Sequence, residues 1–459
     1  MPELLTCTPE RRAEPAPPRL LRFLRPLQVE DPWALLGSRH LDGLRLAAWN
    51  DPTEERCLLA AGHARELWPT GPERFAQAGA AWRDFEAQRV ELRGAGPAEP
   101  LPFALAGFAF SPTPRRSAAW EAWGDGLLWV PELLIQRHAG ACWAALTVPA
   151  GAGADAGLDR LNALLDALLA EARPPAAPRL ASPRAASALS ERAWRTWRQG
   201  VLDAADALRG EDLAKVVLAR AERFESATGD FDPLATARLL RDQQASCVTF
   251  LVRGADGQSF VGATPEDLLR LRGRTLHTVA LAGTRRRAEG DQDAALGREM
   301  LSNDKDRREQ RHVLQAIRDA LAPLSEQLDV PEQPEVARFA QVQHLRSPIR
   351  ATLRDDVDVF ELLARLHPTP AVGGLPRTDA LRWLEAHEDL DRGWYAGPLG
   401  WIGPGGGGVF VVALRSALLQ GPLATAFAGC GLVEGSDPRA EWVETCQKLE
   451  AVRSGLALG

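Results

Sequence analysis

The chain has 459 residues, of which 45% are hydrophobic and 25% are charged, a composition typical of globular proteins. Its net charge is −7 and it has no long basic run, which argues against a nucleic-acid-binding function. No stretch reaches the roughly 18 apolar residues of a membrane span. The first residues also lack the apolar core of a signal peptide, so we expect a cytoplasmic protein that does not bind a membrane.

Cysteine usage fits the same compartment. The six cysteines, at positions 7, 57, 142, 247, 430 and 446, form no CxxC pair and have no close histidine. This scatter favours free thiols in a reducing environment over a zinc site. By length alone the chain could form two or three domains, or one large one.

The N-terminal part, residues 1–186, shows few regular patterns. Short apolar runs at Phe103–Phe110 and Leu127–Ile135 predict strands, and Leu158–Ala172 predicts a helix. A connector rich in proline and alanine, Pro174–Ala186, is the best candidate boundary in the chain. We therefore divide the chain into residues 1–186 and 187–459, and expect the first part to complete sheets within one intertwined domain.

From position 214 onward, strands are more frequent. The sequence predicts strands over Ala214–Phe224, Cys247–Arg253, Thr275–Gly283, Val342–Leu353, Val409–Leu419 and Ala424–Val433. It predicts helices over Pro233–Gln243, Ala294–Leu321, Val357–Ala364, Thr378–Ala386 and Pro438–Val452. Several strands follow one another without a helix between them, which favours large antiparallel sheets over a doubly wound parallel sheet. The tetraglycine Gly405–Gly408 is expected to form a hairpin turn.

Eleven polar residues, Ser302–His312, interrupt the apolar stripe of the helix predicted over Ala294–Leu321. Positions 302, 306, 309, 313 and 317 share one helical face, so Asp306 and Glu309 stand where core residues are expected. One interpretation is a locally solvated helix with ion pairs between residues four apart. The other is that these carboxylates face a cavity in the core.

The last predicted helix carries a second acidic group. Glu441, Glu444 and Lys448 lie three and four residues apart on one face. A surface ion pair between Glu444 and Lys448 would contribute only about 0.3–0.5 kcal/mol. The functional alternative is that Glu444 and Glu309 together hold a hard divalent cation. Mg²⁺ in particular is commonly bound by one or two carboxylates, waters and an anionic substrate group.

Three charged residues suggest further chemistry, although packing or turn geometry can explain each one. Lys215 opens an apolar strand, and if that face is buried, the desolvated amine could act as a general base. Glu266 follows a proline at a turn, and beside an apolar wall it would stay protonated and could act as an acid. Arg415 interrupts an apolar strand and needs a partner such as a carboxylate.

The remaining candidates would bind an anion. Tyr395, the only tyrosine, stands just before the predicted hairpin. Gly429 and Gly431 could bring backbone N–H groups close to a negatively charged ligand. Together these residues indicate an acid–base site, but they do not name a substrate.

Nine motifs carry a resemblance to a known family. They are KVVLAR, FVGATPEDLL, ALAGTRRR, NDKDRREQ, VQHL, LHPTPAVGGLPR, RGWYAGPLGW, VALRSALL and AGCGLVEGSDPRAEWVETCQKL. In this order they resemble the chorismate-utilising enzymes, which include anthranilate, aminodeoxychorismate, isochorismate and salicylate synthases. The resemblance covers about residues 190–459, with a loose match around Leu105–Phe110. It implies an α+β fold in which two large antiparallel β-sheets pack together with helices on the outside.

Three of these motifs distinguish between reactions. Lys215 resembles the lysine of members that use water, and Ala282 stands where aminodeoxychorismate synthases have a lysine. HPTPAVGG is similar to the corresponding segment of isochorismate synthases. The resemblance therefore implies conversion of chorismate to isochorismate for menaquinone or catechol siderophore synthesis. Salicylate synthesis and a non-catalytic, metabolite-binding relative are the alternatives.

The resemblance also implies partners and residue roles. Lys215 would activate water for attack at C2, and Glu266 would protonate the departing C4 hydroxyl. We expect a monomer or homodimer without a glutamine amidotransferase subunit, because Lys215 would obstruct an ammonia path. The substrate would contact Gly283, Thr284, His344, Tyr395, Arg415, Gly429, Gly431 and Lys448.

A magnesium site is the last implication of the resemblance. Mg²⁺ would be bound by Glu309 and Glu444, with Asp306 and Glu441 contacting its waters, and would hold the ring carboxylate. Gln310 departs from the family pattern, because a histidine often follows the metal-site glutamate. This departure puts the metal affinity in question.

Overall fold

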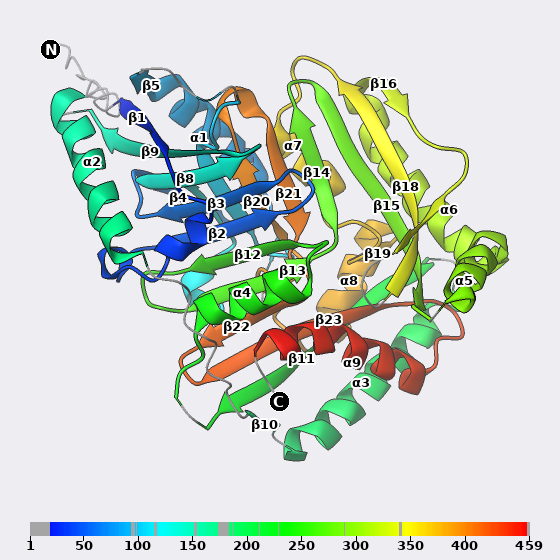
Figure 1. Ribbon diagram of the computed structural model, residues 1–459. Helices are drawn as coiled ribbons and strands as arrows, with labels where there is room; N and C mark the ends of the chain where they lie inside the picture. Colours follow the sequence, from blue (N-terminus) through cyan, green and yellow to red (C-terminus); the bar gives the residue numbers. More distant parts are fainter. Residues whose placement is uncertain are drawn as a thin grey trace, which may run out of the picture.

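The computed structural model contains two large β-sheets with helices around them (Figure 1). It describes residues 19–92, 97, 99–113, 117–150, 154–172, 183–185, 187–210, 212–227, 229–288, 290–338 and 342–456. Within these residues, one sheet has 13 strands and the other has 10. The expected α+β fold with two large, mainly antiparallel sheets is confirmed.

The larger sheet has the spatial order β10-β11-β23-β22-β13-β12-β2-β3-β8-β9-β1-β5, with β19 beside β11. Its strands are β1 Leu20–Leu27, β2 Leu46–Asp51, β3 Arg56–Ala61, β5 Arg89–Leu92, β8 Leu133–His138, β9 Ala141–Pro149, β10 Pro183–Ala185, β11 Lys215–Ser226, β12 Val248–Arg253, β13 Ser259–Thr264, β19 Gly374–Leu375, β22 Ser416–Gln420 and β23 Leu423–Leu432. Only β1 and β5 pair in parallel among the described strands.

The smaller sheet has the order β16-β18-β15-β14-β21-β20-β6-β7-β4, with β17 beside β18. Its strands are β4 Arg65–Leu67, β6 Ala104–Phe108, β7 Gly126–Val130, β14 Asp267–Arg272, β15 Thr275–Arg286, β16 Ser325–Asp329, β17 Glu335–Arg338, β18 Val342–Leu353, β20 Pro398–Ile402 and β21 Gly408–Val412. Strands from the first 150 residues enter both sheets, since β2 pairs with β12 and β6 pairs with β20.

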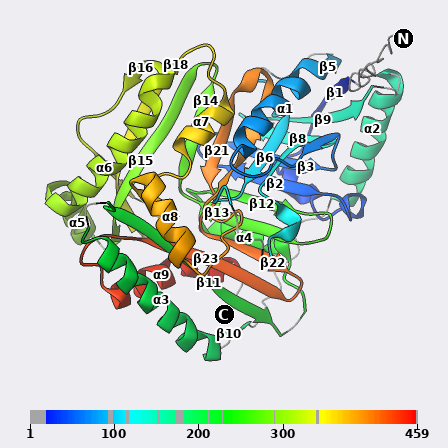
Figure 2. The ribbon, with the colours of Figure 1, turned by 180° about the vertical axis from the view of Figure 1, so that it is seen from behind.

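Helices cover the outer faces of the two packed sheets. They are α1 Arg74–Gln88, α2 Ala154–Glu171, α3 Ser187–Ala207, α4 Pro233–Gln243, α5 Asp291–Ser302, α6 Asp304–Leu321, α7 Val359–Leu366, α8 Arg377–His387 and α9 Pro438–Gly455. Short 3₁₀ turns lie at Pro32–Leu35, Arg39–Leu41, Glu121–Trp123, Ala322–Leu324 and Pro404–Gly406. The view from behind has α7 and α8 in the foreground (Figure 2).

Both faces of the larger sheet are buried, and strand β12 shows how. Phe250 points into the core that includes Phe410 of the smaller sheet. Its neighbour Leu251 points the other way, into a second core with Leu240 of α4 and Leu449 of α9. Because successive side chains of a strand face opposite sides, a strand buried on both faces reads as a continuous apolar run.

The helix predicted over Ala294–Leu321 is wrong as a single element, because α5 and α6 meet at Asn303. The Asn303 side chain accepts a hydrogen bond from the backbone N–H of Asp306 at 3.0 Å and thereby caps α6. Ser302 ends α5 and is exposed, so it does not share the face of Asp306 and Glu309.

The strand predicted over Val409–Leu419 is also two strands. β21 belongs to the smaller sheet and β22 to the larger one, and the chain crosses between them at residues 413–415. Arg415 lies in this crossing with φ of 49°, in the left-handed region. The predicted run Leu127–Ile135 is likewise divided, into β7 of the smaller sheet and β8 of the larger sheet.

The other elements predicted from position 214 onward are confirmed, with ends that agree within three residues. The first three glycines of the tetraglycine lie in the turn between β20 and β21, as expected, and Gly408 begins β21. In the predicted connector, residues 183–185 form β10, while residues 174–182 and 186 lie outside the described part of the chain. No helix in the described ranges is long and apolar enough to cross a membrane. The five described cysteines are free thiols.

Candidate active site

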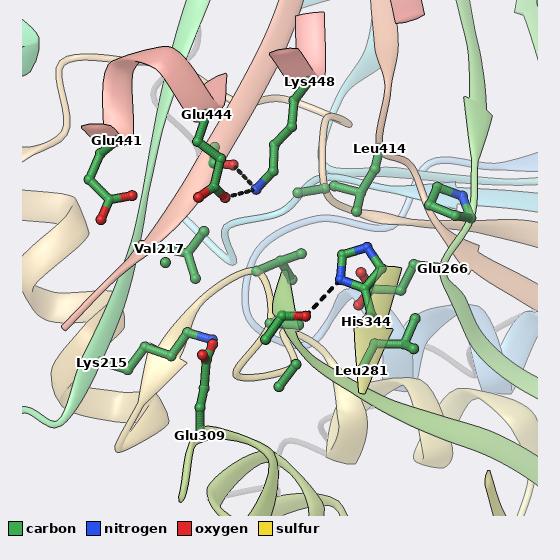
Figure 3. Close-up of a pocket in the computed structure, with 18 of the residues that line it drawn as sticks. Lys215, Val217, Glu266, Leu281, Glu309, His344, Leu414, Glu441, Glu444 and Lys448 are labelled. Carbon is green, nitrogen blue, oxygen red and sulfur yellow. Dashed lines mark hydrogen bonds and ion pairs between the residues drawn. The ribbon is translucent and has the colours of Figure 1, made fainter. Parts of the chain in front are cut away.

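A cavity of about 240 Å³ lies where the two sheets meet (Figure 3). Strands β11 and β23 of the larger sheet and β15 and β18 of the smaller sheet contribute to its wall, together with α6 and α9. The predicted site residues that line it are Lys215, Glu266, Gly283, Asp306, Glu309, His344, Tyr395, Arg415, Gly429, Gly431, Glu441, Glu444 and Lys448. The remaining one, Thr284, pairs with His344 through its backbone, and its side chain lies outside the described ones.

Lys215 and Glu309 point toward each other across the cavity wall (Figure 3). The Lys215 Nζ donates a hydrogen bond to Glu309 Oε1 at 2.8 Å, and Lys215 is 8% exposed. The absence of a side chain at Gly431 makes room for the lysine, because a Cβ there would lie 2.7 Å from the Lys215 Cε. The buried lysine therefore fits beside Gly431, and a carboxylate from α6 holds its amine.

The carboxylates of α6 face this cavity rather than bulk water. Asp306 is buried and forms an ion pair with Arg285 at 3.1 Å. Val313 and Ile317, which continue the same helical face, are buried in the core. Of the two interpretations that the helical pattern allowed, the cavity is the one that the structure shows.

Glu266 lies where the chain crosses from β13 of the larger sheet to β14 of the smaller sheet. Its backbone N–H donates to Thr264 Oγ1 at 3.2 Å, and its carbonyl accepts from the Val412 N–H at 3.0 Å. Burial raises the pKa of the Glu266 carboxyl to about 7, although the positive charges of Lys215, Lys448 and Arg415 act in the opposite direction. Much of this group is therefore protonated at neutral pH.

Arg415 lies at the neighbouring crossing, from β21 to β22. Its carbonyl accepts a hydrogen bond from the Ala263 N–H at 3.2 Å, which joins the two crossings side by side. Burial lowers the pKa of the Arg415 guanidinium. Nearby, Tyr395 is buried and stacks on Phe427 with ring centroids 5.2 Å apart. Burial raises the pKa of Tyr395 to about 12, so its hydroxyl keeps its proton and can donate to an anion.

His344 is neutral at physiological pH. Its Nδ1 lies 3.0 Å from the Gly283 carbonyl oxygen, which can only accept, so Nδ1 carries the proton. Burial lowers the pKa of His344 to about 4, and the charges of Arg415 and Lys448 act in the same direction. The ring therefore leaves Nε2 as an acceptor.

Helix α9 supplies two more carboxylates and a cation. The Lys448 Nζ lies 2.7 Å from Glu444 Oε1 and donates to the Gly429 carbonyl at 2.8 Å. Burial works to raise the pKa of Glu444, but Lys448, Arg415 and other neighbouring groups together outweigh it, and the net shift is downward. Burial and the charge of Glu444 raise the pKa of Glu441. These two acids disfavour each other's charged form, so a cation between them would be stabilising.

The donor set fits a hard divalent cation. Glu309, Glu444, Asp306 and Glu441 all present carboxylate oxygens to the cavity. Among the side chains that the structure describes, no three acidic, histidine or cysteine groups converge closely enough to chelate a metal by themselves. A divalent cation held here would therefore need further ligands from water or a substrate, which Mg²⁺ typically takes.

Gln310 is not among the described residues that line the cavity. It is buried, and its Nε2 donates to the Ala280 carbonyl at 3.0 Å and to Ser347 Oγ at 2.9 Å. The amide therefore fastens α6 to β15 and β18.

Sequence reasoning missed Arg392, which also lines the cavity. The signal was an arginine three residues before Tyr395 in an otherwise apolar motif. Ser436, before the start of α9, was missed as well and lines the same cavity.

Comparisons with known proteins identify the family. The family model described as "Chorismate binding enzyme" matches residues 6–457, so the match includes the N-terminal part that the nine motifs did not cover. The salicylate biosynthesis isochorismate synthase of Pseudomonas aeruginosa is 40% identical over 412 residues, which is 89% of this chain and 84% of that protein. The isochorismate synthase MenF of Bacillus subtilis is 30% identical over 95% of this chain and 93% of its own.

A solved structure has the same fold. It is that of MenF, the menaquinone-specific isochorismate synthase from Escherichia coli, with a TM-score of 0.80 and 27% sequence identity. The superposition covers 97% of this chain and 96% of that one. The chain belongs to the chorismate-binding enzyme family.

Proposed function

We propose that this protein is an isochorismate synthase, which converts chorismate to isochorismate. The observation that carries the proposal is that a lysine amine and a glutamic acid whose pKa is raised to about 7 line one cavity, beside cations able to hold a dianion. The names of the P. aeruginosa and B. subtilis relatives support the same reaction.

The two groups supply the acid and the base. Lys215 takes a proton from a water molecule as the water oxygen bonds to C2 of chorismate. The ring double bond then shifts, and the bond between C4 and its hydroxyl oxygen breaks. Glu266 gives its proton to the departing hydroxyl, so the product is an isomer of the substrate. Paired with Glu309 as an ammonium, Lys215 cannot accept a proton, so the pair has to open and the amine has to give up a proton before it can act as the base.

The cationic residues would hold the substrate carboxylates. The guanidinium of Arg415 has lost its hydration at the cavity wall. A substrate carboxylate would take the place of the lost water by accepting a forked pair of hydrogen bonds. Tyr395 can donate a further hydrogen bond to the same group. Lys448 and the backbone of Gly429 and Gly431 would contact the other end of the substrate.

Mg²⁺ is part of the proposal. Glu309 and Glu444 would bind it, with Asp306 and Glu441 hydrogen-bonded to its waters. When bound, it would supply positive charge to the ring carboxylate and so help to orient the substrate. The neutral His344 adds no positive charge of its own to this part of the wall.

Product identification tests the proposal. Purified protein is incubated with chorismate, with and without Mg²⁺, and the products are separated by chromatography and identified by NMR. We expect isochorismate only when Mg²⁺ is present. Fluorescent salicylate with pyruvate would instead indicate salicylate synthesis, and a product formed only with ammonia would indicate an aminating enzyme. Isochorismate would feed menaquinone or catechol siderophore synthesis.

A further inference from the structure

The strand that carries Lys215 has a gap along one edge. β23 pairs with β11 from Val216 to Glu225 on one side. On the other side, β19 reaches only Lys215 and Val216, and β10 begins again at Phe224. Buried backbone N–H and C=O groups in such a gap need other partners, because leaving them unpaired is costly.

A buried ion pair fills part of this gap. Arg392 Nη2 donates to the Val217 carbonyl at 2.6 Å, and Glu388 Oε2 accepts from the Ala219 N–H at 2.8 Å. Arg392 also binds Glu388 through two hydrogen bonds, Nε to Oε1 at 2.6 Å and Nη2 to Oε2 at 2.7 Å. The pair offers β11 one donor and one acceptor, as a residue of a neighbouring strand would.

The same pair reaches two other segments of the cavity wall. Arg392 Nη1 donates to the Val372 carbonyl at 2.9 Å, and Val372 lines the cavity. The Arg392 carbonyl accepts from the Tyr395 N–H at 2.9 Å. The guanidinium is also 4.1 Å from the centroid of the Phe110 ring. One arginine therefore joins the segments that carry Lys215, Val372 and Tyr395.

Stability alone is a weak reason for such a pair. Arg392 is 4% exposed and Glu388 is 6% exposed, so both charges have lost nearly all their hydration. The mutual attraction of a buried pair often does no more than offset that loss. A planar fork does, however, fix the relative orientation of the groups that it contacts.

We propose that Glu388 and Arg392 are positioning residues that set Lys215 and Tyr395 relative to one another. The proposal rests on the isochorismate synthase function proposed above. The pair does not act on the substrate itself. The pair contacts β11 at the residues two and four positions after Lys215. Loss of the pair would therefore shift the Lys215 amine away from the reacting water.

Two conservative substitutions test this role. Glu388→Gln keeps an acceptor for the Ala219 N–H but removes the charge, and Arg392→Lys keeps the charge but removes the fork. We expect kcat to fall about 10- to 100-fold, the size expected for a small misplacement of a reacting group, with KM for chorismate changed by less than about twofold. Amide hydrogen exchange at Ala219 should become faster in both variants.

A matched control separates positioning from stability. Arg22 is 1% exposed and donates to the Pro102 carbonyl at 2.5 Å, and it is not among the side chains that line the cavity. Arg22→Lys should lower Tm while leaving kcat and exchange at Ala219 unchanged.

The outcomes distinguish the two proposals. Unchanged kcat together with faster exchange at Ala219 would overturn the positioning role, as would a raised KM with unchanged kcat. A parent protein that makes no isochorismate would instead refute the proposed function alone. Exchange at Ala219 would still report whether the pair holds the strand. Unchanged exchange in both variants would overturn the proposal that the pair holds β11.

Discussion

The ammonium of Lys215, at the start of a strand in the larger sheet, lies 2.8 Å from the carboxylate of Glu309. Glu309 is on α6, which packs against β15 and β18 of the smaller sheet. Through α6, this ion pair links the larger sheet to the smaller one at the cavity. The position of the proposed base depends on how both sheets pack.

Replacing Lys215 should remove the base. We expect Lys215→Ala to lower kcat at least about 10²-fold, because the proposed base is removed and a general base typically contributes at least this much. Chorismate binding, measured by calorimetry, should be largely retained. Lys215→Arg is the control for charge, since it preserves a cation near Glu309 but remains protonated and should be equally inactive. Parental activity in either variant would contradict the role.

Replacing Glu266 should remove the acid. Glu266→Gln keeps the shape of the side chain but cannot give up a proton, so we expect turnover to be abolished. Because the pKa of Glu266 is raised to about 7, the acid form of the parent is lost as pH rises through 7. The parent's kcat should therefore fall on the alkaline side of about pH 7, which steady-state rates between pH 5 and 9 would measure.

The same carboxyl links pH to stability. Its pKa in the folded protein is raised above the ordinary value of 4.5, so its protonation stabilises the folded state. That contribution is complete below about pH 4.5 and is lost as pH rises through about 7. The free energy of unfolding in urea is the quantity to measure. For Glu266→Gln it should rise relative to that of the parent as the pH is raised from 5 to 8. A constant difference would show that the group is not buried as described.

Two glycines of β23 should respond differently to alanine. In Gly431→Ala the new Cβ would lie 2.7 Å from Lys215 Cε, so the flexible lysine must move, and we expect a loss of kcat with little change in Tm. In Gly429→Ala the new Cβ would lie 3.1 Å from the Leu218 carbonyl, so the strands must separate and Tm should fall. Gly37→Ala, with nothing within 4 Å, is the neutral control. The reverse order of Tm effects would contradict the geometry.

Removing the Lys448 ammonium should strengthen Mg²⁺ binding in the absence of substrate. Lys448→Met leaves the neighbouring charges of Glu444 and Glu441 uncompensated, so calorimetric titration should show roughly tenfold tighter binding, equivalent to about 1.4 kcal/mol. Arg453→Met, at the far end of the same helix, should leave the affinity unchanged. Unchanged or weaker binding in Lys448→Met would argue against Glu444 as a ligand.

The strongly periodic elements of the C-terminal part could be predicted from sequence, because apolar spacing reports burial directly. Breaks inside apolar runs could not. The run around Arg415 looks continuous because β21 and β22 are each buried on both faces, and its one interruption, Arg415, predicted a binding residue rather than a change of sheet. The boundary at Asn303 was likewise missed, because this residue follows the end of α5 and caps the start of α6 with no loop between the two helices.

Asp306 and Glu309 could be found because they occupy apolar positions of a helix, and Glu441 and Glu444 because they share a helical face with Lys448. Glu388 and Arg392 could not, because they follow the end of α8 and their partners on β11 are about 170 residues away. Long-range hydrogen bonds to backbone groups leave no local pattern in a sequence. Such contacts are visible only once the chain is folded.

The described side chains that line the cavity all follow Ala214, whereas the strands before position 150 extend both sheets away from it. The cavity is therefore encoded in one stretch of the gene, whereas the scaffold is encoded along most of its length. Drift, insertion or recombination in the early stretch should be tolerated wherever the edges of β2 and β6 still match β12 and β20. A change of reaction, by contrast, would have to arise among the last 245 residues.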